Sequence, residues 1–331
     1  MAGGLKALLL NRPRNLPWKG GDQVQEDATA RRLRDLGVDV TQGDALEPDL
    51  AGVDVVHLFN LIGGWTLRQF RHARRCGVPV VISTIYNPRQ YAMNAFVEQL
   101  EMVRGANALL PNSRSEAAKL AADFGRTAPV AIVPNGIEPE GLPAPGDVPF
   151  EARDIALFVG RIDERKRVLE LVRAWSDPRL AGRIPLVLCG HPFLPPYFES
   201  VRAAAALAPA GAIRFEGEVP SSRLGEYYRR ARVFVLPSRL ETPGLANLEA
   251  AASGCALVAG ECDDVRDYFG DLASYCDGSD PRAIADAVVA AWNAPPPAAL
   301  AATVRTRYTW EAAAHATLDA YRAAISAPVG A

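Results

Sequence analysis

Two glutamates near position 240 have the residue type and the spacing to bind hydroxyl groups. Glu241 and Glu249 are separated by seven residues, and an apolar run that ends at Leu236 precedes them. Glu241 lies before the expected helix and can reach over its end, so both carboxylates can touch one ligand across the helix N-terminus. Carboxylates accept paired hydrogen bonds from diols such as a ribose. Surface glutamates at this spacing are common, so the prediction depends on the segment between them.

That segment is typical of a helix start that binds phosphate. Thr242 and Pro243 suit an N-cap and a first helical position. The backbone N–H groups of Gly244 and Leu245 would then point out of the first turn, where hydrogen bonds and the helix dipole favour a diphosphate. Gly254 is a residue type that commonly ends a helix. The segment therefore predicts an anion site at the start of this helix.

Two cations that follow an earlier apolar run are suited to the same diphosphate. The run ends at Gly160, Arg161 comes next, and Lys166 stands five residues further on at the expected start of a helix. Ligands of open α/β sheets bind at the carboxyl ends of the strands, so both side chains are placed to neutralise a leaving diphosphate. A solvated helix start is the alternative, which we prefer for Arg165 and Arg167.

Short aliphatic runs alternate with amphipathic segments along the whole chain, which is typical of parallel sheets covered by helices on both faces. The expected fold class is therefore α/β, with two Rossmann-like doubly wound parallel-sheet domains facing across a cleft. The expected strands are 5–10, 38–41, 53–58, 78–83, 108–110, 130–133, 155–159, 186–189, 213–215, 233–236, 256–259 and 273–276. Helices are expected at 23–36, 65–75, 90–104, 113–124 and 281–292, and between the strands of the second half.

A proline-rich segment separates the two halves. Residues 134–149 hold five prolines and three glycines, so neither a helix nor a central strand can run through them. We expect a first domain over 1–140, a linker over 141–150 and a second domain over 151–309, with the proline-rich segment 134–149 as the hinge. The amphipathic tail, 310–326, is expected to pack back on the first domain.

The bulk composition limits the classes of function. A chain of 331 residues suits two domains, and its formal charge of −2 offers no general field for nucleic acid. Five cysteines without a CxxC pair predict reduced thiols and a cytoplasmic location. The sequence contains no DxD triplet, no GxGxxG and no GxxxxGK[ST]. These absences argue against a carboxylate-held Mg²⁺ or Mn²⁺ at a diphosphate, an NAD enzyme and a P-loop NTPase.

Motifs along nearly the whole chain resemble the family-4 class of retaining glycosyltransferases, which have the GT-B architecture. They are PNSRSEAAKL near Asn112, IVPNGIE at Asn135, FVGRIDERK, the run FEGEVPSSRLGEYYRRARVFVLPS, the two-glutamate segment and the closing YTWEAAAHATLDAY. The resemblance implies that the second domain holds a nucleoside-diphosphate sugar and the first domain an acceptor substrate.

The resemblance also implies roles for residues of the second domain. Arg161 and Lys166 would bind the donor diphosphate and Glu241 the transferred sugar, as catalytic residues, while Glu249 would bind the ribose hydroxyls. For His191, which follows Cys189 where a second glycine-rich turn is expected, a structural or solvated role is the alternative. The remaining residues expected to bind the donor are Gly160, Gly190, His191, Gly217, Val219, Pro243, Gly244 and Leu245.

The set expected on the acceptor side or in the cleft is Gly20, Gly21, His57, Tyr86, Asn112 and Asn135. Gly20 and Gly21 resemble the family's glycine loop, with an ordinary turn as the alternative. Tyr86 stands where many relatives carry a histidine beside the reacting sugar, so the role of that histidine does not transfer directly. His57 is equally suited to an acceptor contact and to a core position.

The expected function is a metal-independent, retaining, hexosyltransferase-like glycosyltransferase. It would move a sugar from a nucleoside-diphosphate sugar to a glycan, lipid-linked or small-molecule acceptor, in cell-envelope or polysaccharide biosynthesis, with no cofactor and no nucleic-acid partner. The alternatives are a catalytically silent sugar-nucleotide-binding subunit and a retaining glucan synthase or phosphorylase on the same fold. The basic segment 67–77 adds a weak peripheral membrane contact as an alternative to a solvated helix face.

Overall fold

The structure, a computed structural model, describes residues 4–13, 20–88, 95–125 and 127–326. It divides into two compact units: unit 1 comprises Met1–Gly136 and Trp310–Ala331, and unit 2 comprises Ile137–Thr309. The segment 141–150, expected as a linker, lies within unit 2. The guanidinium group of Arg305 accounts for this placement, because it donates hydrogen bonds to the carbonyl oxygens of Pro139 and Pro143.

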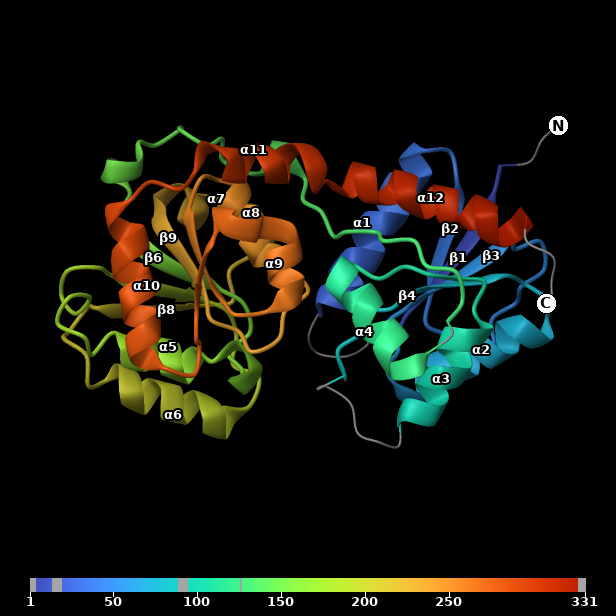
Figure 1. Ribbon diagram of the computed structural model, residues 1–331, viewed down its shortest axis with the longest axis horizontal. Coiled ribbons are helices and arrows are strands. Elements are labelled where there is room, and N and C mark those ends of the chain that lie inside the picture. The colour runs from blue at the N-terminus through green and yellow to red at the C-terminus, as the bar shows by residue number, and fades with distance from the viewer. Residues whose placement is uncertain (1–3, 14–19, 89–94, 126, 327–331) are drawn as a thin grey trace. The chain divides into compact units, whose positions relative to one another are not determined.

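Unit 1 is built on a five-stranded parallel sheet with the strand order β2-β1-β3-β4-β5. The strands are β1 (Lys6–Leu10), β2 (Asp39–Gly43), β3 (Val55–Phe59), β4 (Val80–Ser83) and β5 (Ala108–Leu109). The helices are α1 (Gly21–Asp35), α2 (Gly63–Arg75), α3 (Ala95–Gly105), α4 (Arg114–Phe124) and α12 (Trp310–Ser326). Helices α1 and α12 pack together on one face of the sheet, and α2 and α3 on the other (Figure 1).

Unit 2 contains a six-stranded parallel sheet with the order β11-β10-β9-β6-β7-β8. The strands are β6 (Ile155–Val159), β7 (Leu186–Cys189), β8 (Ile213–Gly217), β9 (Ala231–Leu236), β10 (Ala256–Gly260) and β11 (Ser274–Cys276). The helices are α5 (Val168–Ala174), α6 (Pro195–Ala205), α7 (Ser221–Arg230), α8 (Leu245–Ala252), α9 (Asp263–Phe269), α10 (Pro281–Asn293) and α11 (Ala298–Arg307). Short 3₁₀ turns lie at Pro139–Gly141, Phe150–Ala152, Glu164–Lys166 and Gly270–Leu272.

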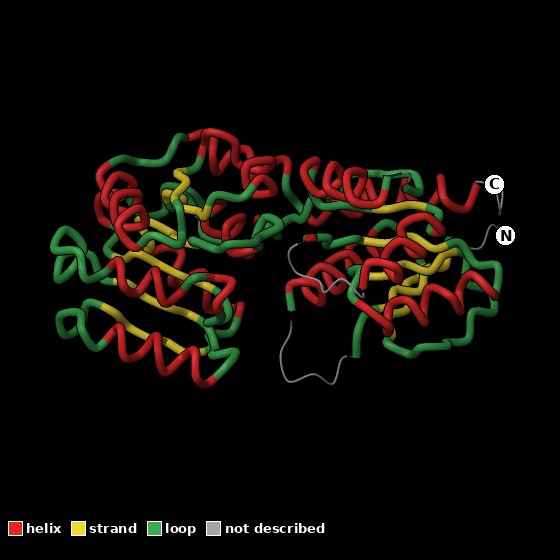
Figure 2. Tube along the Cα trace, turned by 60° about the horizontal axis from the view of Figure 1, so that its bottom comes forward, coloured by secondary structure: helices red, strands yellow, loops and turns green. Residues whose placement is uncertain are grey.

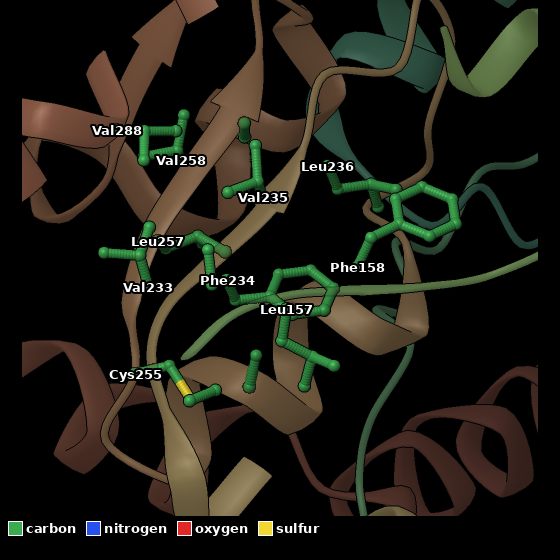
Figure 3. Packing of buried hydrophobic residues seen from close by; sticks show 14 of the residues in the cluster. Leu157, Phe158, Val233, Phe234, Val235, Leu236, Cys255, Leu257, Val258 and Val288 are labelled. Carbon is green, nitrogen blue, oxygen red and sulfur yellow. The ribbon is translucent and has the colours of Figure 1, made fainter. Parts of the chain in front are cut away.

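The central strands of unit 2 are apolar because helices cover both faces of the sheet. Helix α5 packs against α6 and against α10, while α8 packs on α11 and on β9 and β10. Figure 2 shows the strands of each unit between layers of helix. Side chains of β6, β9 and β10 interdigitate in the core, as Figure 3 shows for Leu157, Phe234 and Leu257. This packed sheet fixes the positions of the loops that leave its carboxyl edge.

The fold class expected from the sequence is confirmed: both sheets are parallel and doubly wound. The strand expected at 130–133 is wrong, because Val130 makes only an isolated bridge with Leu109 and is 44% exposed. Residues 90–94 of one expected helix lie outside the described residues. Within the part of the chain that the structure describes, none of the helices is both long enough and apolar enough to cross a membrane.

Candidate active site

The loops after β6, β7 and β8 meet at the carboxyl edge of the unit 2 sheet. The backbone N–H of Gly160 donates to the carbonyl of Cys189 at 2.9 Å, and that of Gly190 to the carbonyl of Gly217 at 2.7 Å. A Cβ atom added to Gly190 would lie 1.8 Å from the carbonyl oxygen of Gly160. Only glycine at position 190 allows this approach, which places the loop that carries Arg161 against the loop after β7.

Asp163 ties the two predicted cations together. Its carboxylate lies 3.3 Å from the Arg161 guanidinium and accepts a 3.1 Å hydrogen bond from the backbone N–H of Lys166. Asp163 is buried and is the N-cap of the 3₁₀ turn Glu164–Lys166. The guanidinium of Arg161 also stacks over the ring of Phe193, 4.8 Å from its centroid. The loop is therefore built to hold both cations in fixed positions.

Lys166 and Glu241 form an ion pair, although they lie 75 positions apart in the sequence. Ser238 donates a 3.0 Å hydrogen bond to the same carboxylate oxygen. The Lys166 side chain is 20% exposed and that of Glu241 12%, so ligand access is retained at a largely desolvated pair. A cation and a carboxylate thus stand side by side at the carboxyl edge, the pairing needed to bind a phosphate and an adjacent hydroxyl together.

Helix α8 begins two residues later than expected. Its N-cap is Gly244, whose φ of +81° lies outside the helical region, and the helix starts at Leu245. Pro243 therefore precedes the helix, and its carbonyl accepts a hydrogen bond of 2.7 Å from the Asn247 amide. A Cβ atom at Gly244 would lie 3.1 Å from the second carboxylate oxygen of Glu241. The first turn of α8 thus lies directly beside Glu241.

Glu249 lies one turn into α8 and is held from another helix. The hydroxyl of Tyr228, on α7, donates to its carboxylate at 2.6 Å. Burial raises the pKa of Glu249, and the hydrogen bond from Tyr228 lowers it. The side chain keeps some exposed surface, so its remaining oxygen can serve a ligand.

The other residues predicted to bind the donor lie at the same edge of unit 2. Gly217 ends β8 with a φ of +70°. The carbonyl of His191 accepts a 2.9 Å hydrogen bond from the N–H of Ile162, and the imidazole Nε2 of His191 is buried without a partner among the described residues. Val219 packs partly against the core of unit 2. The backbone at Gly217 is therefore better placed to contact the donor than the side chain of Val219, which is packed partly against the core.

In unit 1, the structure places His57 in the core. The side chain is fully buried on β3, with Nδ1 2.7 Å from the Tyr321 hydroxyl and Nε2 2.9 Å from the Ser83 hydroxyl. It stacks on Phe59 at 4.3 Å. Burial lowers the pKa of His57 to about 3, so the imidazole is neutral. Of the two roles left open by the sequence, the geometry supports the core position.

Tyr86 is also turned inward. Its hydroxyl donates to Asp123 at 2.7 Å and its ring packs on Phe124, which leaves the side chain 3% exposed. The preceding residue, Ile85, adopts a φ of +44°, which is rare for a β-branched side chain. The buried carboxylate of Glu116 accepts a hydrogen bond from the Tyr86 backbone N–H at 2.7 Å. Ile85, between the strand end and the buried Tyr86, is partly exposed.

The remaining acceptor-side residues lie at the carboxyl edge of unit 1 or in its interior. Gly20 caps α1, and a Cβ atom there would lie 2.2 Å from the Asp22 carboxylate, whereas Gly21 has open space around it. Residues 14–19, which precede Gly20, lie outside the described residues. Asn112 is fully buried and accepts a 3.0 Å hydrogen bond from Gln25, and Asn135 is 7% exposed.

Two further observations bear on the location of the site. Among the described residues no three His, Cys, Asp or Glu side chains are grouped so that they could hold a metal ion. A cavity of about 260 Å³ lies between the segments at Pro145–Phe150 and Pro296–Ala301, next to Arg153 and Gly254 at the amino ends of β6 and β10. It touches none of the predicted residues, so we assign the site from the charged groups at the opposite edge.

Comparison with known proteins identifies the family of the chain. The model for the family of glycosyl transferases group 1 matches residues 153–294. A D-inositol 3-phosphate glycosyltransferase from Streptomyces griseus is 30% identical in an alignment that covers 82% of this chain and 67% of the relative. The chain belongs to the group 1 glycosyltransferases. It is therefore a glycosyltransferase, as the sequence predicted.

Solved structures similar to this group 1 glycosyltransferase share its fold. Sucrose-phosphate synthase from Thermosynechococcus elongatus has a TM-score of 0.79 at 18% identity, and the match covers 96% of this chain and 98% of the other. HepE from Anabaena, crystallised with UDP and glucose, has a TM-score of 0.69 at 14% identity, with 96% and 95% coverage. Both are glycosyltransferases of the GT-B architecture, which confirms the predicted architecture.

The structure adds three site residues that sequence reasoning missed: Asp163, Ser238 and Tyr228. Asp163 could have been found, because an aspartate three residues before Lys166 is a typical N-cap. Ser238 stands three residues before Glu241, within reach of its carboxylate in a tight loop. No local sequence pattern marks Tyr228, because its contact with Glu249 joins two helices that come together only in the folded chain.

Proposed function

We propose that this group 1 glycosyltransferase takes its sugar from a nucleoside-diphosphate sugar bound at the carboxyl edge of unit 2. The observation that carries the proposal is the meeting of Lys166 with Glu241 beside the first turn of α8. Charge builds on the diphosphate as the glycosidic bond breaks, and fixed cations there stabilise the transition state more than the ground state. The complex of HepE with UDP and glucose supports a nucleotide-sugar donor.

In this proposal each group has one task. Arg161 and Lys166 neutralise the diphosphate, the N–H groups at the start of α8 add hydrogen bonds to it, and Glu241 accepts a hydroxyl of the transferred sugar. Glu249 accepts the ribose hydroxyls. No side chain has to serve as a strong general base if the leaving phosphate takes the proton of the acceptor hydroxyl, which places attack and departure on the same face and retains the anomeric configuration.

For the acceptor substrate we propose a small polyol phosphate. The support is the name of the relative from Streptomyces griseus, which specifies inositol 3-phosphate. An ion pair of Arg12 with Asp22, 2.7 Å long and partly exposed, lies at the carboxyl edge of unit 1 after β1, and from the neighbouring strands β1 and β3 the chain continues to opposite sides of the sheet. Ligands of open α/β sheets bind at such a point, and the guanidinium is suited to a phosphate group.

The test is a panel of nucleoside-diphosphate sugars in a thermal-shift assay, followed by turnover with inositol phosphates. A ligand specific for the folded protein raises the melting temperature by mass action. We expect one donor to stabilise the protein, and transfer to a polyol phosphate to yield a product whose NMR coupling constants show the donor's anomeric configuration. Activity should persist in EDTA. Loss of activity in EDTA with recovery on adding Mg²⁺ would refute the metal-independent mechanism.

A further inference from the structure

Tyr228 makes a contact that the proposed mechanism does not yet use. The residue belongs to α7, its side chain is fully buried, and its hydroxyl donates to Oε2 of Glu249 on α8 at 2.6 Å. Its backbone carbonyl is contacted by the Arg153 guanidinium at 3.5 Å and by the Cys255 thiol at 3.5 Å. Its ring lies 6.2 Å from that of Phe234 in the core. Tyr228 is therefore fixed along its whole length.

This contact determines which oxygen of Glu249 a ligand can use. A carboxylate offers two oxygens, and the phenol occupies one of them. The other oxygen remains for the diol of a ribose, and the carboxylate cannot rotate without breaking its bond to a fixed hydroxyl. Without that bond the glutamate would populate several rotamers, and the conformational entropy lost on ordering it would weaken donor binding.

The same contact favours the charged form of the glutamate. Burial raises the pKa of Glu249, and the phenol opposes this because its O–H donates to the carboxylate. Tyr228 cannot ionise near neutral pH, since burial and the neighbouring glutamate raise its pKa well above the usual value. Among the described residues, the other titratable groups near Tyr228 are the thiols of Cys189 and Cys255 and the guanidinium of Arg153, which contacts its backbone carbonyl. Burial raises the pKa of each thiol to about 12, so both are neutral.

We propose that Tyr228 is a positioning residue for donor binding, whose hydroxyl holds the Glu249 carboxyl group oriented toward the ribose of the nucleoside-diphosphate sugar. The inference rests on the proposed function, because it takes Glu249 as the ribose ligand. It adds that the strength and pH dependence of donor binding depend on a residue of α7 that touches no substrate. A tyrosine buried only for packing would have no such effect, because its hydroxyl would be dispensable.

The chain offers a matched pair of substitutions. Tyr228→Phe keeps the buried ring and removes only the hydroxyl. Tyr227→Phe, one residue earlier on the same helix, also removes a hydroxyl bonded to a carboxylate, since Tyr227 donates to Glu216 at 3.2 Å on the exposed side. Donor KM and kcat are measured for the full-length protein and both variants from pH 5 to 8, with melting temperatures recorded alongside.

We expect Tyr228→Phe to raise the donor KM about tenfold, equivalent to about 1.4 kcal/mol, while kcat stays within about threefold. The acidic limb of kcat/KM for the donor should move to higher pH, because Glu249 without its hydrogen-bond donor takes up a proton more readily. Tyr227→Phe should match the unsubstituted protein. In a Glu249→Gln background, Tyr228→Phe should add little, since its partner carboxylate is already gone.

Several outcomes would overturn the inference while the proposed function stands. These are an unchanged donor KM and acidic limb in Tyr228→Phe, equal losses in both tyrosine variants, or full additivity with Glu249→Gln. The cycle with Glu249→Gln remains decisive if Tyr228→Phe lowers the melting temperature, because a general loss of folding would add to the effect of Glu249→Gln. Failure of every nucleoside-diphosphate sugar to bind the unsubstituted protein would instead refute the proposed function.

Discussion

Substituting Gly190 by alanine tests whether the backbone contact between two loops positions the cations of the site. An added Cβ atom would lie 1.8 Å from the carbonyl oxygen of Gly160 and 2.8 Å from its carbonyl carbon. Both neighbours are backbone atoms, so no side chain can move aside. Reaching even a tight 3.0 Å contact requires a shift of about 1.2 Å, the difference between 3.0 Å and 1.8 Å, at the residue before Arg161.

A shift of this size should affect catalysis more than folding. A misplacement of about 1 Å can cost about 10²-fold in rate, and overpacking costs about 1–3 kcal/mol of stability. We therefore expect Gly190→Ala to fold, to melt a few degrees lower, and to lose about 10²-fold in kcat/KM for the donor. Circular dichroism and thermal unfolding check the fold, and initial rates of sugar transfer measure the loss.

Gly182→Ala is the matched control for this substitution. Gly182 lies before the amino end of β7, has a φ of +70° and has no atom within 4 Å of an added Cβ. It therefore bears the backbone strain of an alanine at positive φ without the collision, and should lose about 1 kcal/mol of stability with unchanged turnover. If Gly190→Ala turned over within threefold of Gly182→Ala, the reasoning that the contact positions Arg161 would be refuted.

Three further predictions concern single side chains. Arg161→Ala should lower kcat by about 10²–10³ with the fold intact, and near-normal turnover would remove Arg161 from the mechanism. Burial lowers the pKa of His57 to about 3 from 6.5, so the free energy of unfolding should fall by up to about 1.4 kcal/mol per pH unit as the pH is lowered from roughly 6 to 4. His57→Gln should not show this dependence when its unfolding in urea is measured over the same pH range. Equal slopes of unfolding free energy against pH in the two proteins would contradict the conclusion that the His57 imidazole is neutral. Ile85→Asn should be at least as stable as Ile85→Val, because asparagine tolerates the positive φ that strains isoleucine by about 1–2 kcal/mol; lower stability of the asparagine variant would speak against strain.

The sequence was most informative where a strand is buried on both faces. The expected runs 155–159 and 186–189 coincide with β6 and β7, because apolar runs that end at a glycine leave little freedom in their bounds. The run 130–133 has the same β-branched composition but is followed by Pro134 and exposes Val130 and Ile132. Composition alone did not reveal that this segment meets the sheet only through an isolated bridge with Leu109.

The charged residues at the unit 2 edge could be named from the sequence, but their partners could not. Local spacing predicted cations after β6 and carboxylates around α8, since strand ends and helix starts are local features. The ion pair of Lys166 with Glu241 and the hydrogen bond of Tyr228 to Glu249 join residues from different strand–helix units. The start of α8 was placed too early because Pro243 is a good first helical residue, whereas the φ of Gly244 delays the helix.

The cations of the unit 2 edge carry their own counterions. Arg161 is paired with Asp163, Lys166 with Glu241 and Arg167 with Asp277. An incoming anion must replace these carboxylates as the partner of the cations, so its binding releases few dissolved counterions. Inorganic phosphate should therefore bind weakly here, because it replaces the carboxylates and leaves them without a partner. A ligand that carries both a phosphate and hydroxyl groups binds the cations with one and the released carboxylates with the other, so this edge selects for such molecules.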